Sequence, residues 1–234
     1  MSTVAEAPQV ASPDAIFHVV EAPSPTPVEL TNMSALEGPR TLRPSDAGRR
    51  MAFEDFILCD FEDGCFYELA RGIIVVAEVP GVPHGRIVYR VGRLFYRYEE
   101  LHPDRINYRA GGMECRLRLP AMSCDRHPDQ AVYLSPPPDE GPKLWTRWAP
   151  DLVVEIVSAG GEERDYGEKR EEYLRAGVRE YWILNPATRI LHALRRAGDT
   201  WQEETVTADG LYRCPILPGL EVRPVDLFGP IEAA

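Results

Sequence analysis

Residues 151–158, Asp-Leu-Val-Val-Glu-Ile-Val-Ser, constrain the fold more than any other segment. The run is typical of a β-strand, and because alternate side chains of a strand point to opposite faces, Glu155 shares a face with Val153 and Val157. An otherwise apolar strand therefore carries a carboxylate in its middle. Burying an unpaired carboxylate is costly, so Glu155 needs a metal ion, a basic partner or water. The alternative is an edge strand on which Glu155 faces solvent or pairs with an arginine.

A second carboxylate, Asp129, stands at the start of another apolar strand, predicted over residues 130–134. Oxygen ligands from Asp129 and Glu155 on adjacent strands suit Mg²⁺ or Mn²⁺, with positions left for water and phosphate. Lys169 follows in the first turns of a predicted helix, where a short connection can bring its cation beside such an ion. Singly, Asp129 reads as a turn residue and Lys169 as a solvated helix residue. The combination predicts a metal-dependent site.

The remaining pattern predicts a mixed α/β (α+β) fold in which hairpins and helices are interspersed. Residues 65–69 and 73–79 flank a glycine turn and form a predicted hairpin, as do residues 190–195 and 201–207. Helices are predicted over residues 86–101 and 165–176; Asp165 and Glu168 form a capping box for the second, and Gly177 closes it. A short helix is expected at residues 52–60, with further strands at residues 113–119, 130–134, 152–157 and 181–184. These elements indicate a mixed β-sheet with helices packed on it.

Residues 1–50 differ from the remainder because they are rich in proline and show no sustained periodicity. Such a segment buries too little apolar surface to offset its ordering entropy. We therefore expect a disordered or loosely attached extension, followed by a single domain over residues 51–230. No apolar run approaches the ~20 residues that cross a bilayer, and the N-terminus lacks the pattern of a secretory signal. We expect no membrane partner and a cytoplasmic location.

Charge and cysteine usage narrow the classes of function. The formal net charge of −11 excludes a protein that coats nucleic acid through bulk positive charge. The five cysteines include no Cys-x-x-Cys pair and fit reduced thiols better than a disulfide framework. A zinc site built from Cys115, Cys124 and His127 is the alternative, although its spacing lacks a second pair of ligands.

Several motifs together carry a resemblance to a known family. They are Tyr67-Glu68-Leu69, His84 with Arg86-Ile87, Pro128-Asp129, Pro150–Ser158, Asp165-Tyr166-Gly167-Glu168-Lys169, Tyr173–Val178, Glu180–Leu184 and Leu217–Leu220. They resemble the Uma-type putative restriction endonuclease family of the PD-(D/E)XK nuclease superfamily. The resemblance runs from about Ala52 to Phe228, and the block from Glu155 to Trp182 is its most specific part.

The resemblance implies a restriction-endonuclease-like core, a mixed β-sheet flanked by helices with extra hairpins. It also implies that Asp129 and Glu155 bind the metal ion and that Lys169 is the catalytic lysine. Two positions depart from the pattern. The superfamily's usual lysine, two residues after the strand glutamate, would fall on Val157, and Ile73 stands where relatives carry a glutamate after the hairpin glycine. Glu68 lies near that second position and is the accessory acid of the predicted site.

Two further features flank the predicted site. His84 precedes the first long helix and is a second accessory residue, for contact with substrate or a catalytic water; a lone histidine in a Pro/Gly loop is otherwise structural or incidental. A stripe of arginines lies along this helix. It would contact a phosphate backbone or simply form the solvated face of the helix. The stripe consists of Arg86, Arg90, Arg93 and Arg97.

We therefore expect a Mg²⁺- or Mn²⁺-dependent endonuclease that hydrolyses DNA phosphodiester bonds, and a two-fold homodimer if it cuts both strands. The alternative is a catalytically inactive nuclease-fold module with an interaction or regulatory role. Ile73 favours the alternative, whereas the set Asp129, Glu155 and Lys169 favours the enzyme.

Overall fold

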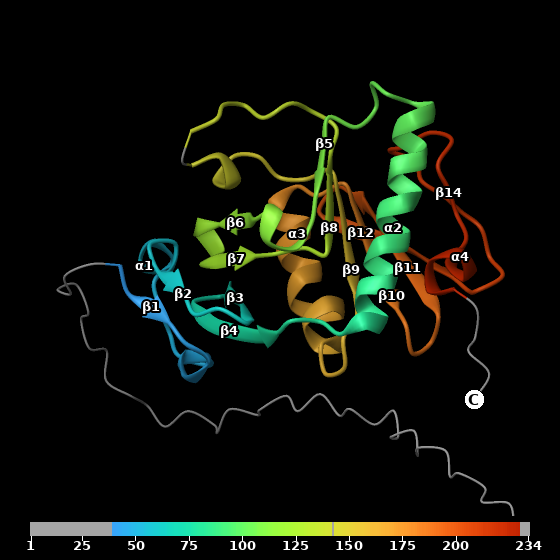
Figure 1. Cartoon of the computed structure of the whole chain (residues 1–234). Helices are drawn as coiled ribbons and strands as arrows, with labels where there is room; N and C mark the ends of the chain where they lie inside the picture. Colours follow the sequence, from blue (N-terminus) through green and yellow to red (C-terminus); the bar gives the residue numbers. More distant parts are fainter. Residues whose placement is uncertain (1–38, 142, 230–234) are drawn as a thin grey trace, which may run out of the picture.

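A six-stranded sheet with the order β12-β11-β10-β9-β8-β5 forms the centre of the molecule (Figure 1). The computed structural model describes residues 39–141 and 143–229. Strands β9 and β10 are parallel, and every other neighbouring pair in this sheet is antiparallel. The strands are β5 (Tyr108–Ala110), β8 (Gln130–Tyr133), β9 (Leu152–Ile156), β10 (Glu180–Asn185), β11 (Ile190–Ala197) and β12 (Thr200–Val206). The predicted mixed sheet with hairpins is confirmed.

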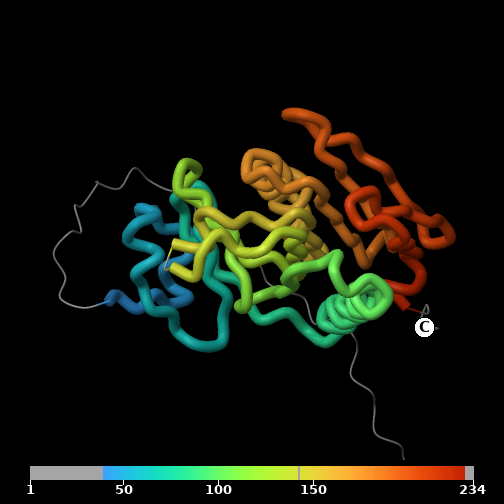
Figure 2. Tube along the Cα trace, turned by 90° about the horizontal axis from the view of Figure 1, so that it is seen from above, coloured from blue at the N-terminus to red at the C-terminus, as the bar shows by residue number. Residues whose placement is uncertain are grey.

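Two helices cover opposite faces of this sheet, as the green and orange segments of Figure 2 show. Helix α2 (Val82–Leu101) packs Ile87, Val91 and Phe95 against the face of β9 that carries Val154. Helix α3 (Lys169–Ala176) packs Tyr173 against the other face, which carries Val153. Because Glu155 alternates with Val154 along β9, its side chain lies on the α3 side.

A smaller sheet of four strands, in the order β4-β3-β7-β6, lies beside the central one. Strand β3 pairs with β4 in the predicted hairpin, and Leu42, Phe53 and Phe56 pack on β3 to form its apolar cluster. Its strands are β3 (Cys65–Ala70), β4 (Ile73–Glu78), β6 (Leu117–Leu119) and β7 (Cys124–Arg126). The remaining elements are β1 (Thr41–Leu42), α1 (Phe53–Phe56), β2 (Asp60–Phe61), β13 (Tyr212–Arg213), β14 (Glu221–Val222) and α4 (Pro224–Phe228).

The starts of both helices differ from the prediction. Helix α2 starts at Val82, so His84 lies in its first turn and not in a preceding loop. Pro83 fits there because the first turn of a helix has no partner for the missing N–H. Asp165 lies inside a π-helical turn, Arg164–Glu168, that leads into α3, so the predicted capping box of Asp165 and Glu168 is wrong. The predicted stop at Gly177 is confirmed, with a left-handed φ of 89°.

Other boundaries also shift. Of residues 113–119, only Leu117–Leu119 form a strand, because Gly112–Glu114 make a 3₁₀ turn. The helix predicted at residues 52–60 is limited to α1. The 190–195/201–207 hairpin is confirmed as β11 and β12.

The expected boundary near residue 50 falls inside the packed structure. Strand β1 pairs in parallel with β2, and Leu42 is fully buried. Residues 39–50 therefore contribute to the small sheet's apolar cluster, while residues 1–38 of the expected extension lie outside the described residues. Within the described ranges, none of the helices has the length and apolar character needed to span a membrane.

Candidate nuclease site

Glu155 is buried in the middle of β9, with a side chain that is 4% exposed. One carboxylate oxygen, Oε1, lies 3.1 Å from Nζ of Lys169 and accepts a 2.5 Å hydrogen bond from the Tyr173 hydroxyl. No residue of the described ranges donates to the other oxygen, Oε2. The edge-strand alternative is wrong, because β9 lies between β8 and β10.

Lys169 stands where the π-helical turn passes into α3, and its side chain is 10% exposed. Its Nζ also lies 3.2 Å from Oδ1 of Asp165, one turn earlier. The lysine is thus held between two buried carboxylates. Burial disfavours its charge, but Glu155, Asp165 and Glu68 outweigh burial and raise the pKa of Lys169, so the amine stays protonated.

Asp129 immediately precedes β8, whose first residue, Gln130, pairs with Val154. Continuing this register places Asp129 opposite Glu155. One oxygen of Asp129, Oδ2, accepts a hydrogen bond of 2.7 Å from the amide of Ile156 and lies 3.1 Å from Nε2 of His84. Among the described residues, none donates a hydrogen bond to Oδ1. The predicted acids and the predicted lysine therefore come together at one end of the central sheet.

The pKa values of these groups reflect burial and crowding of like charges. Burial raises the pKa of Glu155 to about 8, and Asp129 and Asp165 add to the effect, while Lys169 opposes it. Burial also raises the pKa of Asp165, again against Lys169. Burial lowers the pKa of His84, but its hydrogen bond with Asp129 outweighs burial and raises the pKa above the usual value. A crowded set of acids with one cation is an arrangement that a divalent ion would stabilise.

The donor set fits a hard divalent ion held by few protein ligands. Asp129 and Glu155 each have one oxygen engaged by protein donors and one that no described residue engages. In the part of the chain that the structure describes, no three His, Cys, Asp or Glu side chains are grouped so as to hold an ion. Two carboxylates with the remaining positions left to water and substrate oxygens suit Mg²⁺, which keeps several waters. The zinc alternative finds no support, because among the described residues Cys115, Cys124 and His127 do not form a group that could hold an ion.

Glu68 lies on the small sheet and is fully engaged. Its Oε2 accepts a hydrogen bond of 3.1 Å from the buried guanidinium of Arg126, and its Oε1 accepts one of 2.8 Å from the amide of His127. Although burial raises its pKa, Lys169 and Arg126 outweigh burial and lower the pKa of Glu68 to about 2. Arg126 also binds Glu172 and Glu168, and so ties the small sheet to α3. Glu68 therefore acts on the site through its charge.

The arginine stripe divides into different roles. Nη1 of Arg90 donates to the carbonyl of Phe228, 2.9 Å away, and so ties α2 to α4. The guanidinium of Arg93 lies 5.8 Å from the centre of the exposed Tyr89 ring. Arg86, Arg93 and Arg97 are exposed, whereas Arg90 is half-buried. Arg90 therefore contributes to the packing of α2 on α4, and Arg93 and Arg97 lie on the outer face of α2.

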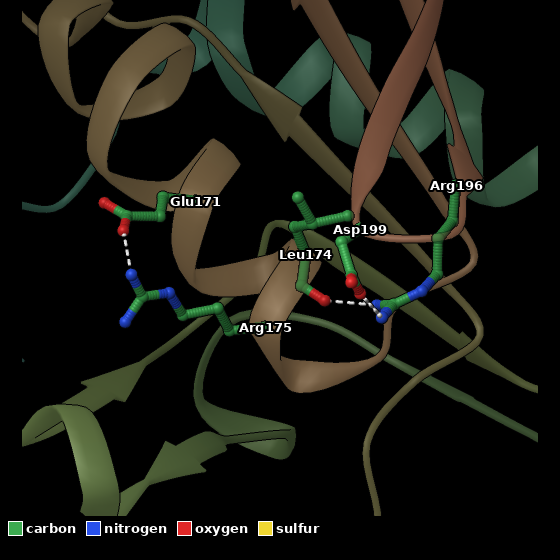
Figure 3. A pocket seen from close by; sticks show the side chains of 5 residues that line it. All are labelled: Glu171, Leu174, Arg175, Arg196 and Asp199. Carbon is green, nitrogen blue, oxygen red and sulfur yellow. Dashed lines mark hydrogen bonds and ion pairs between the residues drawn. The ribbon is translucent and has the colours of Figure 1, made fainter.

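A surface pocket of about 510 Å³ lies between α3 and the β11–β12 hairpin (Figure 3). Its charged groups interact with one another: Arg175 lies 2.6 Å from Glu171, and Arg196 lies 3.8 Å from Asp199 and donates to the carbonyl of Leu174. None of the predicted site residues lines it. The predicted acid cluster and this pocket are therefore separate places on the molecule.

Sequence reasoning missed Tyr173, Arg126 and the role of Asp165. Tyr173 and Asp165 lie four residues after and before Lys169, so helical spacing alone could have placed the three side chains on one face. A compositional signal was also present. Of the 26 lysines and arginines, only Lys143 and Lys169 are lysines, and Lys143 is exposed. A chain that uses arginine almost everywhere retains a buried primary amine at this site.

Comparison with known proteins identifies the family of this chain. The model of the Uma2 family, described as "Putative restriction endonuclease", matches residues 53–226. This chain belongs to the Uma2 family. The resemblance carried by the motifs is therefore confirmed. No curated protein matches the chain.

The fold of this Uma2 protein is similar to the crystal structure of "a putative nuclease belonging to DUF820" from Anabaena variabilis. The two share 19% sequence identity with a TM-score of 0.60, and the match covers 76% of this chain and 97% of the other. At this identity the likeness establishes the fold, and the predicted nuclease-like fold class is confirmed.

Proposed function

We propose that this Uma2 protein is a divalent-metal-dependent endonuclease that hydrolyses phosphodiester bonds of DNA. The observation that carries the proposal is the buried contact of Lys169 with Glu155, at the end of the sheet where Asp129 lies opposite. Burying a charged lysine and a glutamate is expensive and seldom stabilises a fold more than apolar packing would. A catalytic role accounts for keeping such a pair, and family membership supports nuclease activity as that role.

In this proposal Asp129 and Glu155 hold Mg²⁺ or Mn²⁺ through the oxygens that the described donors leave open. When bound, the ion stabilises negative charge that develops on the phosphate. Lys169 stays protonated, so it serves as a cation that orients the attacking water and offsets phosphate charge, and not as a general base. His84 fixes the orientation of Asp129 through the hydrogen bond to Oδ2.

Nucleic acid would reach this site despite the net charge of −11, because the exposed arginines of α2 follow the turn that carries His84. Binding should then be weak and sensitive to salt. A two-fold dimer would cut both strands. The five free thiols support a reducing, cytoplasmic location.

The test is nicking of supercoiled plasmid at low salt with Mg²⁺ or Mn²⁺, with EDTA as the metal-free arm. We expect Glu155→Gln, Asp129→Asn and Lys169→Met to lose cleavage, and Lys143→Met, which changes the exposed lysine, to retain it. A parallel RNA substrate separates DNA from RNA preference. Equal cleavage by the wild type, Glu155→Gln and Lys169→Met, or none by any of them on either nucleic acid, would reject the proposal.

The second candidate is a nuclease-fold module without activity, favoured by Ile73 in place of the glutamate of relatives. In the structure Ile73 opens β4 and pairs with Ala70. If this candidate holds, Ile73→Glu gains metal-dependent cleavage that the wild type lacks. If the enzyme proposal holds, the wild type cleaves without the substitution.

A further inference from the structure

Four buried side chains form a continuous chain of contacts through the proposed nuclease site. Nζ of Lys169 lies 3.2 Å from Oδ1 of Asp165 and 3.1 Å from Oε1 of Glu155. The same Oε1 accepts a hydrogen bond of 2.5 Å from the hydroxyl of Tyr173. The residues are 5%, 8%, 3% and 0% exposed in that order. Asp165 and Tyr173 have no role in the proposed chemistry so far, although they make direct contacts with two residues that do.

We propose that Asp165 and Tyr173 are the positioning residues of this site: Asp165 fixes the amine of Lys169, and Tyr173 fixes the carboxylate of Glu155. This inference rests on the proposed function, because positioning these two groups matters only if the site is catalytic. The Tyr173 hydroxyl donates to Oε1 of Glu155 and Nζ of Lys169 lies beside the same oxygen, so together they orient Oε2 as the oxygen that the described donors leave open. Asp165 and Glu155 contact Nζ at similar distances, so the amine is held by two carboxylates of different elements.

The local structure accounts for this alignment. Asp165, Lys169 and Tyr173 are spaced by four residues and lie along one side of the helical segment. A π-helical turn is often found at functional sites, and here it spans Arg164–Glu168, ending at Lys169. The hydroxyl of Tyr181 on β10 donates 2.9 Å to the backbone carbonyl of Asp165 and anchors the turn on the sheet.

A purely structural role explains this chain of contacts poorly. Buried ion pairs can often be replaced by apolar residues without loss of stability, so stability alone gives little reason to retain them. Positioning gives a reason, because a displacement of about 1 Å in a catalytic group can lower a rate by about 10²-fold.

The test reads the lysine directly, without substrate. Because Lys143 and Lys169 are the only lysines, ¹⁵N-lysine labelling gives two Nζ resonances, and the exposed Lys143 is an internal control. In Asp165→Asn we expect the Lys169 resonance to shift and its amine protons to exchange at least about fivefold faster, with Lys143 unchanged. Tyr173→Phe should shift Lys169 less, and Glu163→Gln, an exposed acid directly before the π-helical turn, should shift neither lysine.

Nicking assays then give the catalytic readout. We expect Asp165→Asn to lower kcat about 10²-fold and Tyr173→Phe about tenfold, with KM for DNA changed less than twofold. Asp165→Glu restores the charge and should recover part of both the rate and the Nζ resonance. Circular dichroism confirms folding of each variant, and only folded variants are compared.

The outcomes separate this inference from the proposed function. An unchanged Lys169 resonance in folded Asp165→Asn and Asp165→Glu overturns the positioning role, whatever the nuclease assay gives. A rise in KM with kcat preserved also overturns the positioning role. A shifted Lys169 resonance in a protein that cleaves no nucleic acid supports the positioning of the lysine and rejects the nuclease.

Discussion

Glu68 and Glu155 are both buried glutamates on β-strands, and both interact with the charge of Lys169, yet their pKa values move in opposite directions. Glu68 lies on the small sheet, where Lys169 and Arg126 outweigh burial and lower its pKa to about 2. Glu155 lies on the central sheet, where burial, reinforced by Asp129 and Asp165, raises its pKa to about 8. Glu68 is therefore a stable carboxylate anion in the small sheet, whereas burial disfavours the ionised form of Glu155 in the central sheet.

The difference follows from how completely each carboxylate is engaged. Both oxygens of Glu68 accept hydrogen bonds, from Arg126 and from the amide of His127. In Glu155 the hydrogen bond from Tyr173 and the ion pair with Lys169 both involve one oxygen, Oε1. A carboxylate that the fold satisfies holds the molecule together, whereas one that the fold leaves incomplete is suited to bind an ion. Substitutions at the two positions should therefore separate stability from activity.

The largest effect is expected for the activity of Glu155→Gln. The amide cannot supply a carboxylate oxygen to the ion, so we expect metal-dependent nicking to fall by about 10³-fold. The apparent Tm at pH 6 should change by only a few degrees, because glutamine has the shape of glutamate and its carbonyl oxygen can still accept the hydrogen bond from Tyr173. A variant that nicks plasmid at the wild-type rate contradicts this assignment.

Glu68→Gln should show the opposite result. The substitution removes a charged acceptor from Arg126 and His127, and we expect the free energy of unfolding to fall by roughly 2–3 kcal/mol. Urea denaturation measures the loss, with Glu78→Gln, an exposed acid on the neighbouring strand, as the matched control. If Glu68→Gln unfolds at the wild-type urea concentration, Glu68 is not the structural member of the pair.

The alkaline dependence of stability tests Glu155 further. Between pH 4.5 and about 8 the unfolded chain has lost this proton and the folded chain retains it, so raising the pH favours unfolding. The contribution is about 1 kcal/mol per pH unit. Urea midpoints at pH 5, 6, 7 and 8 should therefore fall more steeply for the wild type than for Glu155→Gln. Parallel curves for the two proteins would show that Glu155 is ionised throughout.

The acid dependence is the smallest expected effect and belongs to Glu68. Because its folded pKa is about 2 and the usual value is 4.5, its stabilisation is complete above pH 4.5 and is lost as the pH falls toward 2. Unfolding curves between pH 5 and pH 3 should fall less steeply for Glu68→Gln than for the wild type. Glu155→Gln should fall at least as steeply as the wild type in this range, and a reduced slope there would reverse the assignments.

The sequence by itself determined most of the local elements and pointed to the residues proposed for the site. Runs of strand-forming residues on either side of a glycine turn predicted both hairpins, which the strand pairing confirms, and the lone carboxylate in an apolar strand singled out Glu155. Asp129 and Lys169 followed from strand entry and helix position, because these depend on neighbours within a few residues. The start of α2 and the π-helical turn escaped prediction, since tertiary contacts decide where a helix end is stabilised.

Only the tertiary structure decided which buried charges meet. Glu68 and Arg126 are 58 residues apart in the chain, and Glu155 and Tyr173 are 18 apart. Local patterning shows that a carboxylate is buried but not whether both of its oxygens are satisfied, because its donors come from other elements. The pKa of a buried acid depends on those donors, so the opposite behaviour of Glu68 and Glu155 arises only when the two sheets and α3 come together.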